Sequence, residues 1–356
     1  MNIKQIPEDF IVTEIIDLNT NPKGDYTYFW LTKKNWTTMR AVQEIAKQCQ
    51  VSFKRFKFAG IKDRAAITKQ AVSAFKVESQ VLENVKLKDI KIEIIGKGNA
   101  PISLGTLAGN KFEITVRNLP KKFKLKKITK FPNFFGEQRF GYGNTALIGK
   151  EIIKGNLELA VKYLLTFSEI KNKEAQKARA FAKKNWGNWK EVLNKFPKFL
   201  SLEKAVLEWL TKYPNDFAGA LRKVPKPIRK LYVYAYQSLL FNKALEKWSK
   251  KHKENKQLVV PGYKTKLKND EFSKHIISIL KKEAIDLAKF KCQTMPELAA
   301  PGIRRSAFII IKELKSSSLE SDELNKNKKK LKLEFELPKN TYATTLLNVL
   351  FKHGKT

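Results

Sequence analysis

The chain has 356 residues, of which 42% are hydrophobic, so it can bury a full-sized core and is more easily explained by two domains than by one. Its 71 basic and 34 acidic residues give a formal net charge of +37, which favours a polyanionic partner, above all nucleic acid. Two widely separated cysteines, Cys49 and Cys292, and three histidines confined to the last third argue against a disulfide framework, a zinc site and histidine-based catalysis.

The chain opens with a segment, Met1–Phe10, that lacks the apolar core of a signal peptide. Two strands are predicted next, Phe10–Ile16 and Tyr26–Leu31, separated by the turn signal Pro22–Asp25. A helix from about residue 38 to 49 follows, with Thr37 or Thr38 as the N-cap and an apolar face at helical spacing. Because no run approaches the roughly 18 apolar residues of a membrane helix, we expect a cytoplasmic protein without membrane association.

A half-buried strand is predicted around residue 114. Phe112, Ile114 and Val116 alternate there with the polar residues Lys111, Glu113, Thr115 and Arg117, which places the two sets on opposite faces. From about residue 145 to 300 the pattern becomes mostly helical, for example over 156–165 and 228–248.

The last part of the chain returns to a strand pattern. Residues 315–330 are rich in Ser, Glu, Asn and Lys without apolar periodicity, which predicts a flexible surface loop. A strand over 331–337 and a helix over 343–351 follow. Since mixed α and β patterns flank the helical part, we predict an α+β fold in which one domain is interrupted by an insertion.

Asp63 is the acidic residue of greatest chemical interest. It follows an apolar stretch, in the segment Gly60-Ile61-Lys62-Asp63-Arg64, where flanking cations would favour the ionised carboxylate. Local chemistry alone favours the simpler interpretation, because an Asp after a Gly is more often a turn residue than a catalytic one.

The segment from Phe58 to Gln70 resembles the signature of the TruD family of pseudouridine synthases, Gly-x-Lys-Asp-[Lys/Arg]-x-Ala-[Leu/Val]-Thr-x-Gln, with Ile67 at the aliphatic position. Other segments resemble the same family in the same order, and the resemblance spans nearly the whole chain. They are Lys4 with Pro7–Glu14, Leu104–Phe112, Asn133–Gly141, Gln237–Asn242, and Phe335–Pro338 with Tyr342–Thr344. The last segment departs from the family pattern at Asn340, which replaces a glycine; Asn tolerates positive φ, so we expect the turn to persist.

The resemblance implies a fold and an activity. It implies a catalytic domain with a mixed, mainly antiparallel sheet, formed by residues 1–140 and 306–356, and a mostly helical TRUD-like insertion domain at 141–305, with a junction motif at 131–141. It implies an isomerase (an intramolecular transferase) that converts a uridine of tRNA, at position 13, to pseudouridine. Such enzymes break the C1′–N1 bond of a flipped-out uridine, rotate the uracil and rejoin it through C5, with one aspartate and no metal or redox cofactor.

The resemblance also assigns site residues. Asp63 matches the catalytic aspartate, Lys4 a lysine that would keep it ionised and oriented, Phe112 the active-site aromatic, and Asn110 its polar companion on the same strand face. Without the resemblance, Phe112 would be assigned to the core and Lys4 to the surface. Lys62, Gln138 and Arg139 are weaker candidates for substrate binding; the segment of the last two could equally be a structural hinge.

Two alternatives stay open on the sequence alone. One is a catalytically silent RNA-binding or RNA-folding protein on the same scaffold, which the charge and aromatics would also support. The other is a basic structural protein of the ribosome. Ten of the 71 basic residues are Arg, and so strong a lysine bias also fits an inert lysine-rich surface. We expect a monomer, since no coiled-coil heptads occur.

Overall fold

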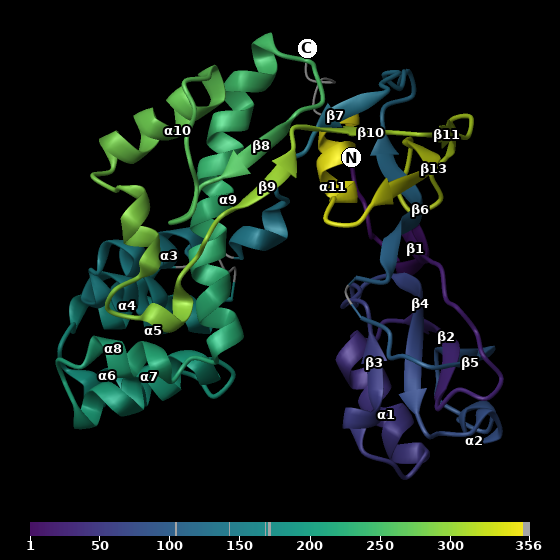
Figure 1. The fold of residues 1–356 in the computed structure, drawn as a ribbon, viewed down its shortest axis with the longest axis horizontal. Coiled ribbons are helices and arrows are strands. Elements are labelled where there is room, and N and C mark those ends of the chain that lie inside the picture. The colour runs from purple at the N-terminus through teal and green to yellow at the C-terminus, as the bar shows by residue number, and fades with distance from the viewer. Residues whose placement is uncertain (104, 142, 168, 170–171, 352–356) are drawn as a thin grey trace. The chain divides into compact units, whose positions relative to one another are not determined.

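The computed structural model describes residues 1–103, 105–141, 143–167, 169 and 172–351. Leu104, the first residue of one family-like segment, and His353, one of the three histidines, lie outside these ranges. The chain forms two compact units (Figure 1). Unit 1 comprises Met1–Phe131 and Ile310–Thr356, and unit 2 comprises Pro132–Ile309. The chain passes from one to the other in β7 (Lys130–Pro132) and returns in β10 (Phe308–Ile310), which pair as a small sheet of their own.

The described part of unit 1 contains a nine-stranded sheet built from both ends of the chain, which is why Figure 1 draws it in purple, blue and yellow. Its strands are β1 (Phe10–Ile16), β2 (Tyr26–Lys34), β3 (Phe56–Phe58), β4 (Ile67–Phe75), β5 (Ile90–Gly98), β6 (Leu107–Leu119), β11 (Leu314–Ser316), β12 (Glu320–Ser321) and β13 (Lys329–Pro338). The order is β11-β13-β6-β1-β4-β2-β5, with β12 on β13 and β3 on β4. Within this sheet β1 and β4 run parallel and the other pairs antiparallel.

Helix α1 (Thr38–Gln48) covers one face of this sheet. Thr37 caps it by accepting a hydrogen bond from the N–H of Arg40, and its apolar stripe packs on Phe29 and Leu31 of β2. In the antiparallel register, Leu31 lies opposite Gln70 and shares its sheet face. Polar side chains on that face are therefore enclosed beneath α1. Unit 1 also contains α2 (Ser79–Glu83), α11 (Ala343–Phe351), η1 (Pro7–Asp9) and η2 (Phe53–Arg55).

Unit 2 is mostly helical and is organised around the long helix α9 (Lys226–Lys251), on which α3 and α10 pack. Its other elements are η3 (Glu137–Phe140), α3 (Thr145–Lys154), α4 (Leu157–Thr166), α5 (Lys173–Lys184), α6 (Trp189–Lys195), α7 (Ser201–Lys212), α8 (Phe217–Arg222), α10 (Glu271–Lys282), η4 (Leu287–Lys291), η5 (Pro296–Leu298), and the strand pair β8 (Gln257–Val260) and β9 (Ile303–Ser306). Helices α3 and α9 approach so closely that a β-carbon at Gly149 would overlap the carbonyl oxygen of Tyr232.

The α+β fold with a mainly antiparallel sheet is confirmed, as are the predicted strands and helices. Asn340 has φ 64°, so the expected positive φ at this turn is also confirmed. Two local predictions are wrong in part. Residues 315–330 lie mostly at the surface, as predicted, but they include β12 and most of β11, and Asp322 is buried beside Arg117 and Asn118 of β6. Arg117 is buried rather than on the solvent face of β6. The boundaries at 140/141 and 305/306 stay a prediction.

Candidate active site

Asp63 lies in the loop between β3 and β4, and buried polar side chains hold the main chain of this loop. Gln70 of β4 donates from Nε2 to the carbonyl oxygen of Gly60 at 3.1 Å. Gln70 accepts a hydrogen bond from Thr38 Oγ1 at 2.8 Å, and Thr38 Oγ1 accepts one from the N–H of Lys62 at 3.0 Å. Because Thr38 and Gln70 are fully buried, these bonds are shielded from water and fix the loop against α1 and the sheet.

Lys33 of β2 is fully buried and provides a second anchor for the loop. Its ammonium donates to the carbonyl oxygen of Asp63 at 3.0 Å and to that of Trp36 at 2.6 Å. Burial lowers the pKa of Lys33 to about 8, an effect that the Asp63 carboxylate opposes and the Lys62 ammonium reinforces. The loop therefore rests on a cation whose protonation changes close to neutral pH.

The Asp63 carboxylate forms an ion pair and hydrogen bond with the Lys4 ammonium. The two side chains are 36% and 20% exposed, so the carboxylate is held in one direction yet stays accessible to a substrate. Lys4 has φ 58°, an uncommon conformation for a lysine, and its ammonium also lies 4.0 Å from the centre of the Phe10 ring. The structure thus places Lys4 beside Asp63, where the family resemblance expects it, and the catalytic roles of the two residues stay a prediction.

Lys62 is engaged inside the fold. Its ammonium forms an ion pair and hydrogen bond with Glu14 of β1, whose side chain is completely buried. The other carboxylate oxygen of Glu14 accepts the backbone N–H of Ala71 at 3.0 Å. Because a buried carboxylate needs such partners, the observed contact of Lys62 is with the sheet. Its predicted role in substrate binding stays a prediction.

Asn110 and Phe112 lie on β6, between β1 and β13, on the same sheet face as their partners Glu14 and Phe335. Phe112 is 7% exposed; its ring lies 6.1 Å from that of Phe10, edge to face, and stacks on Phe335 at 5.4 Å. The Asn110 Oδ1 atom is buried and has no hydrogen-bond partner among the described residues. Through Phe10, the aromatic group is continuous with the Lys4–Asp63 pair.

A buried charge cluster holds the segment that carries Lys4. The N–H groups of the next two residues donate to Asp9 Oδ2 at 3.0 and 3.1 Å, and Arg117 Nε donates to Asp9 Oδ1 at 2.7 Å. Arg117 Nη1 donates to Asp322 Oδ1 at 2.9 Å. Burial alone would raise the pKa of Asp322, but the hydrogen bonds it accepts outweigh burial and lower it. Asp9, Arg117 and Asp322 thus clamp the N-terminal segment to β6 and to the loop after β12.

Sequence and structure comparisons identify the family. The family described as "tRNA pseudouridine synthase D (TruD)" matches residues 1–259 and 246–349. The chain belongs to this family. A protein of Methanopyrus kandleri named as a tRNA pseudouridine synthase D is 34% identical, over 92% of this chain and 86% of its own length. One from Methanocaldococcus jannaschii is 34% identical, over 100% of this chain and 93% of its own.

A solved structure gives the same result for the fold. The crystal structure of a TruD protein from Methanosarcina mazei superimposes with a TM-score of 0.80 at 30% sequence identity, covering 98% of this chain and 93% of that one. No helix among the described residues of this TruD-family protein is both long and apolar enough to cross a membrane.

The remaining two predicted residues, Gln138 and Arg139, lie in η3 and belong to unit 2. The Arg139 guanidinium lies 5.4 Å from the centre of the Phe135 ring. Asn242 fixes the backbone of Phe135 by accepting its N–H at 2.8 Å and donating to its carbonyl oxygen at 2.9 Å. The two family-like segments of unit 2, 133–141 and 237–242, are thus bonded to each other.

Four supporting residues were not singled out from the sequence: Lys33, Thr38 as a loop anchor, Arg117 and Asp322. Thr38 and Gln70 carried a weak signal, since Thr38 is a candidate helix cap and Gln70 ends the family-like segment around Asp63. Lys33 and Arg117 read as ordinary charged residues among 71 basic ones, and nothing in the sequence distinguishes a buried cation from an exposed one.

Proposed function

We propose that this TruD-family protein is a tRNA pseudouridine synthase that isomerises a uridine, at position 13 of tRNA, with Asp63 as the catalytic carboxylate. One observation carries the proposal: the Asp63 carboxylate is accessible and oriented by Lys4, on a loop whose main chain is bonded to buried Lys33, Gln70 and Thr38. A rigid backbone with a directed, accessible carboxylate is what attack at a ribose carbon requires.

The reaction is an internal rearrangement. The C1′–N1 bond breaks, the uracil rotates, a C1′–C5 bond forms, and the proton on C5 is lost while N1 gains one, so atoms and electrons balance without a redox partner. Asp63 can serve either by attacking C1′ or by removing a ribose proton, and the same position suits both steps. Lys4 keeps the carboxylate pointed at the site through either course.

Asn110 and Phe112 supply the proposed site for the detached base. The buried Asn110 Oδ1 can accept a hydrogen bond from a uracil N–H, which would satisfy an acceptor that otherwise lacks a partner among the described residues. Phe112 is mostly covered by Phe10 and Phe335, so it offers the uracil a fixed apolar wall rather than an open ring face.

The test is to incubate the protein with unmodified tRNA and map pseudouridine, comparing wild type with Asp63→Ala and Asp63→Asn. We expect product with wild type and none with either variant, while both variants still bind tRNA. No product from wild type on any tRNA would leave the silent RNA-binding alternative, and product from Asp63→Ala would reject the site. A tRNA with C13 in place of U13 should yield none; product elsewhere would reject the position.

Further proposals concern organisation. Residues 1–140 with 306–356 are proposed as the catalytic domain and 141–305 as a TRUD-like insertion domain, acting as a cytoplasmic monomer that needs no metal, with Lys62, Gln138 and Arg139 contacting substrate. Sedimentation at the concentrations of the assay measures the oligomeric state, and activity after treatment with a chelator measures the need for metal. A dimer in the first, or lost activity in the second, would contradict them.

A further inference from the structure

A hollow of about 370 Å³ in unit 2 is not used by the chemistry proposed above. It lies where the end of α9, the strand pair β8 and β9 and the start of α10 meet. Lys256, Lys266, Lys268 and Arg304 contribute to its lining, and all four are exposed. Among the described residues, none of these four cations forms an ion pair with a carboxylate, so their positive charge is available to a ligand.

The carboxylates in the same lining are already engaged. Asp270 caps α10 by accepting the N–H of Ser273 at 2.9 Å. Glu271 accepts from His252 Nε2 at 2.8 Å and from Lys251 at 3.1 Å, and these two bonds lower the pKa of Glu271. Because these acidic groups are held by local partners, the hollow presents net positive charge to an incoming group.

One wall of the hollow is formed by His252, whose ring is held by several contacts. The His252 ring stacks on Trp248 at 4.7 Å with an interplanar angle of 11°, and its other nitrogen bonds to Glu254 at 3.1 Å. Trp248 itself is buried. A wall fixed in this way lowers the entropy cost of holding a ligand against it.

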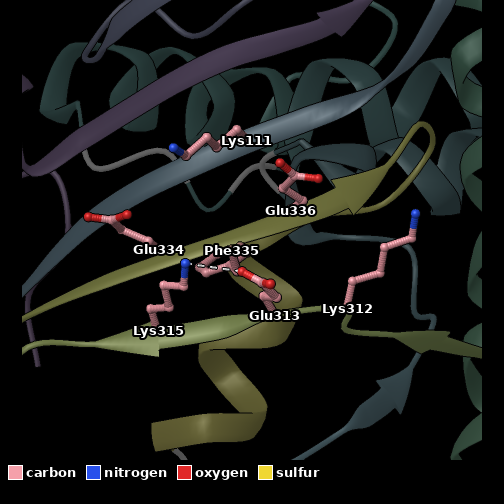
Figure 2. A pocket seen from close by; sticks show the side chains of 7 residues that line it. All are labelled: Lys111, Lys312, Glu313, Lys315, Glu334, Phe335 and Glu336. Carbon is pink, nitrogen blue, oxygen red and sulfur yellow. Dashed lines mark ion pairs between the residues drawn. The ribbon is translucent and has the colours of Figure 1, made fainter.

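A second hollow, on the sheet of unit 1, gives a useful contrast. Figure 2 shows that Lys111, Lys312 and Lys315 line it together with three glutamates, and Lys315 pairs with Glu313 at 3.2 Å. Three cations and three anions cancel, so that hollow has no preference for a polyanion. In a chain of 71 basic residues, convergence of unpaired cations around a concave surface is therefore a more selective signal than charge alone.

We propose that the hollow in unit 2 binds a backbone phosphate of tRNA through Lys256, Lys266, Lys268 and Arg304. The proposal rests on the proposed function only in taking tRNA as the RNA. The phosphate interaction contributes affinity and positions the substrate, while the chemical step stays with Asp63.

The experiment compares two full-length variants of equal charge. One carries Lys256→Gln, Lys266→Gln, Lys268→Gln and Arg304→Gln. The matched control carries Lys177→Gln, Lys190→Gln, Lys198→Gln and Lys212→Gln, four exposed residues of unit 2 that lie outside the hollow. Affinity for tRNA is measured across salt concentrations, and kcat and KM are measured separately.

We expect the hollow variant to bind tRNA at least about tenfold more weakly, with the slope of log K against log salt reduced by about 1 for each phosphate that is no longer neutralised. Its KM should rise with kcat unchanged, and the control should stay within about threefold of wild type. Equal affinity and slope in the two variants would overturn the inference. The inference would also be overturned if the hollow bound inorganic phosphate saturably while the four substitutions left the affinity for tRNA unchanged.

Two further outcomes keep the test decisive. If the fourfold variant is less stable to heat than the control, the pair Lys266→Gln and Lys268→Gln, between β8 and α10, replaces it, and unchanged tRNA affinity in that pair rejects the site. If the wild type binds tRNA through the hollow but forms no pseudouridine, the proposed function fails and this inference stands.

Discussion

Replacement of Lys33 by Met tests how the Asp63 loop is anchored. The variant removes the ammonium that donates to the carbonyl oxygens of Asp63 and Trp36, while the methionine fills a similar volume. Each of these partly buried carbonyls left without a donor costs up to about 3 kcal/mol. Against this, the wild type bears the cost of burying a charge. The decrease of the Lys33 pKa from 10.5 to about 8 corresponds to about 3 kcal/mol at pH values below 8.

The two effects oppose each other at pH 7, so the free energy of unfolding of Lys33→Met should differ from wild type by no more than about 3 kcal/mol there. The cost of burying the charge disappears as pH rises, because Lys33 loses its proton in the folded state. Between about pH 8 and 10.5 the folded state has released the Lys33 proton and the unfolded state still holds it. Stability rises with pH wherever the unfolded state binds more protons, so wild type should gain up to about 3 kcal/mol relative to Lys33→Met across this range.

Urea unfolding of both proteins at pH 7, 8, 9 and 10 measures this difference, and other groups that titrate in the same range cancel in it. A difference between wild type and variant that stays flat from pH 8 to 10 would refute the reasoning. In the Lys33→Met variant we also expect kcat to fall at least about tenfold, because a small displacement of the Asp63 carboxylate slows the chemical step. The affinity for tRNA should stay unchanged.

Three further predictions concern other interactions. Lys4→Met should lower kcat by about two orders of magnitude without weakening tRNA binding, since only the orientation of Asp63 is disturbed, and Lys4→Arg should recover part of it; equal rates for the two variants would argue against an ionic role. Arg117→Met should reduce the free energy of unfolding by about 3–5 kcal/mol because two buried carboxylates lose their cation, and adding Asp322→Asn should restore part of that stability, as denaturant titrations can measure. Gly149→Ala should lower the melting temperature, because its methyl group forces α3 away from α9, whereas the exposed helical substitution Lys177→Ala should not.

Hydrophobic periodicity predicted the elements of the fold well where burial follows a regular pattern. The apolar stripe of α1 and the alternation along β1, β6 and β13 are direct consequences of packing one face against a core. At residues 315–330 the pattern gave no sign of β11 and β12, which pair with β13, or of the burial of Asp322. Asp322 binds Arg117, a residue 205 positions earlier, and such a long-range pair leaves no local signal.

In the candidate site, too, some residues could be predicted from the sequence and others could not. Asp63, Asn110 and Phe112 were found through motif resemblance, and their contacts could not be derived from spacing. Lys33 occupies a strand position that an exposed lysine could fill equally well, so its burial becomes apparent only when α1 covers the sheet. Supporting residues of this kind act through backbone carbonyls, which carry no side-chain signature.

Asp63 and Lys4, the proposed catalytic pair, are held in place by separate sets of contacts. The main chain at Asp63 is bonded to Lys33, while Lys4 is carried by a segment that Asp9 and Arg117 clamp to the end of β6. Among the described residues, the Lys4–Asp63 ion pair links these two sets of contacts. Substitutions at Lys33 or in the clamp of the N-terminal segment should therefore lower kcat by disturbing the same Lys4–Asp63 contact. Once one substitution has broken this ion pair, a second should lower kcat by less than it does alone. The geometry of the carboxylate thus depends on the stability of the N-terminal segment as much as on its own loop.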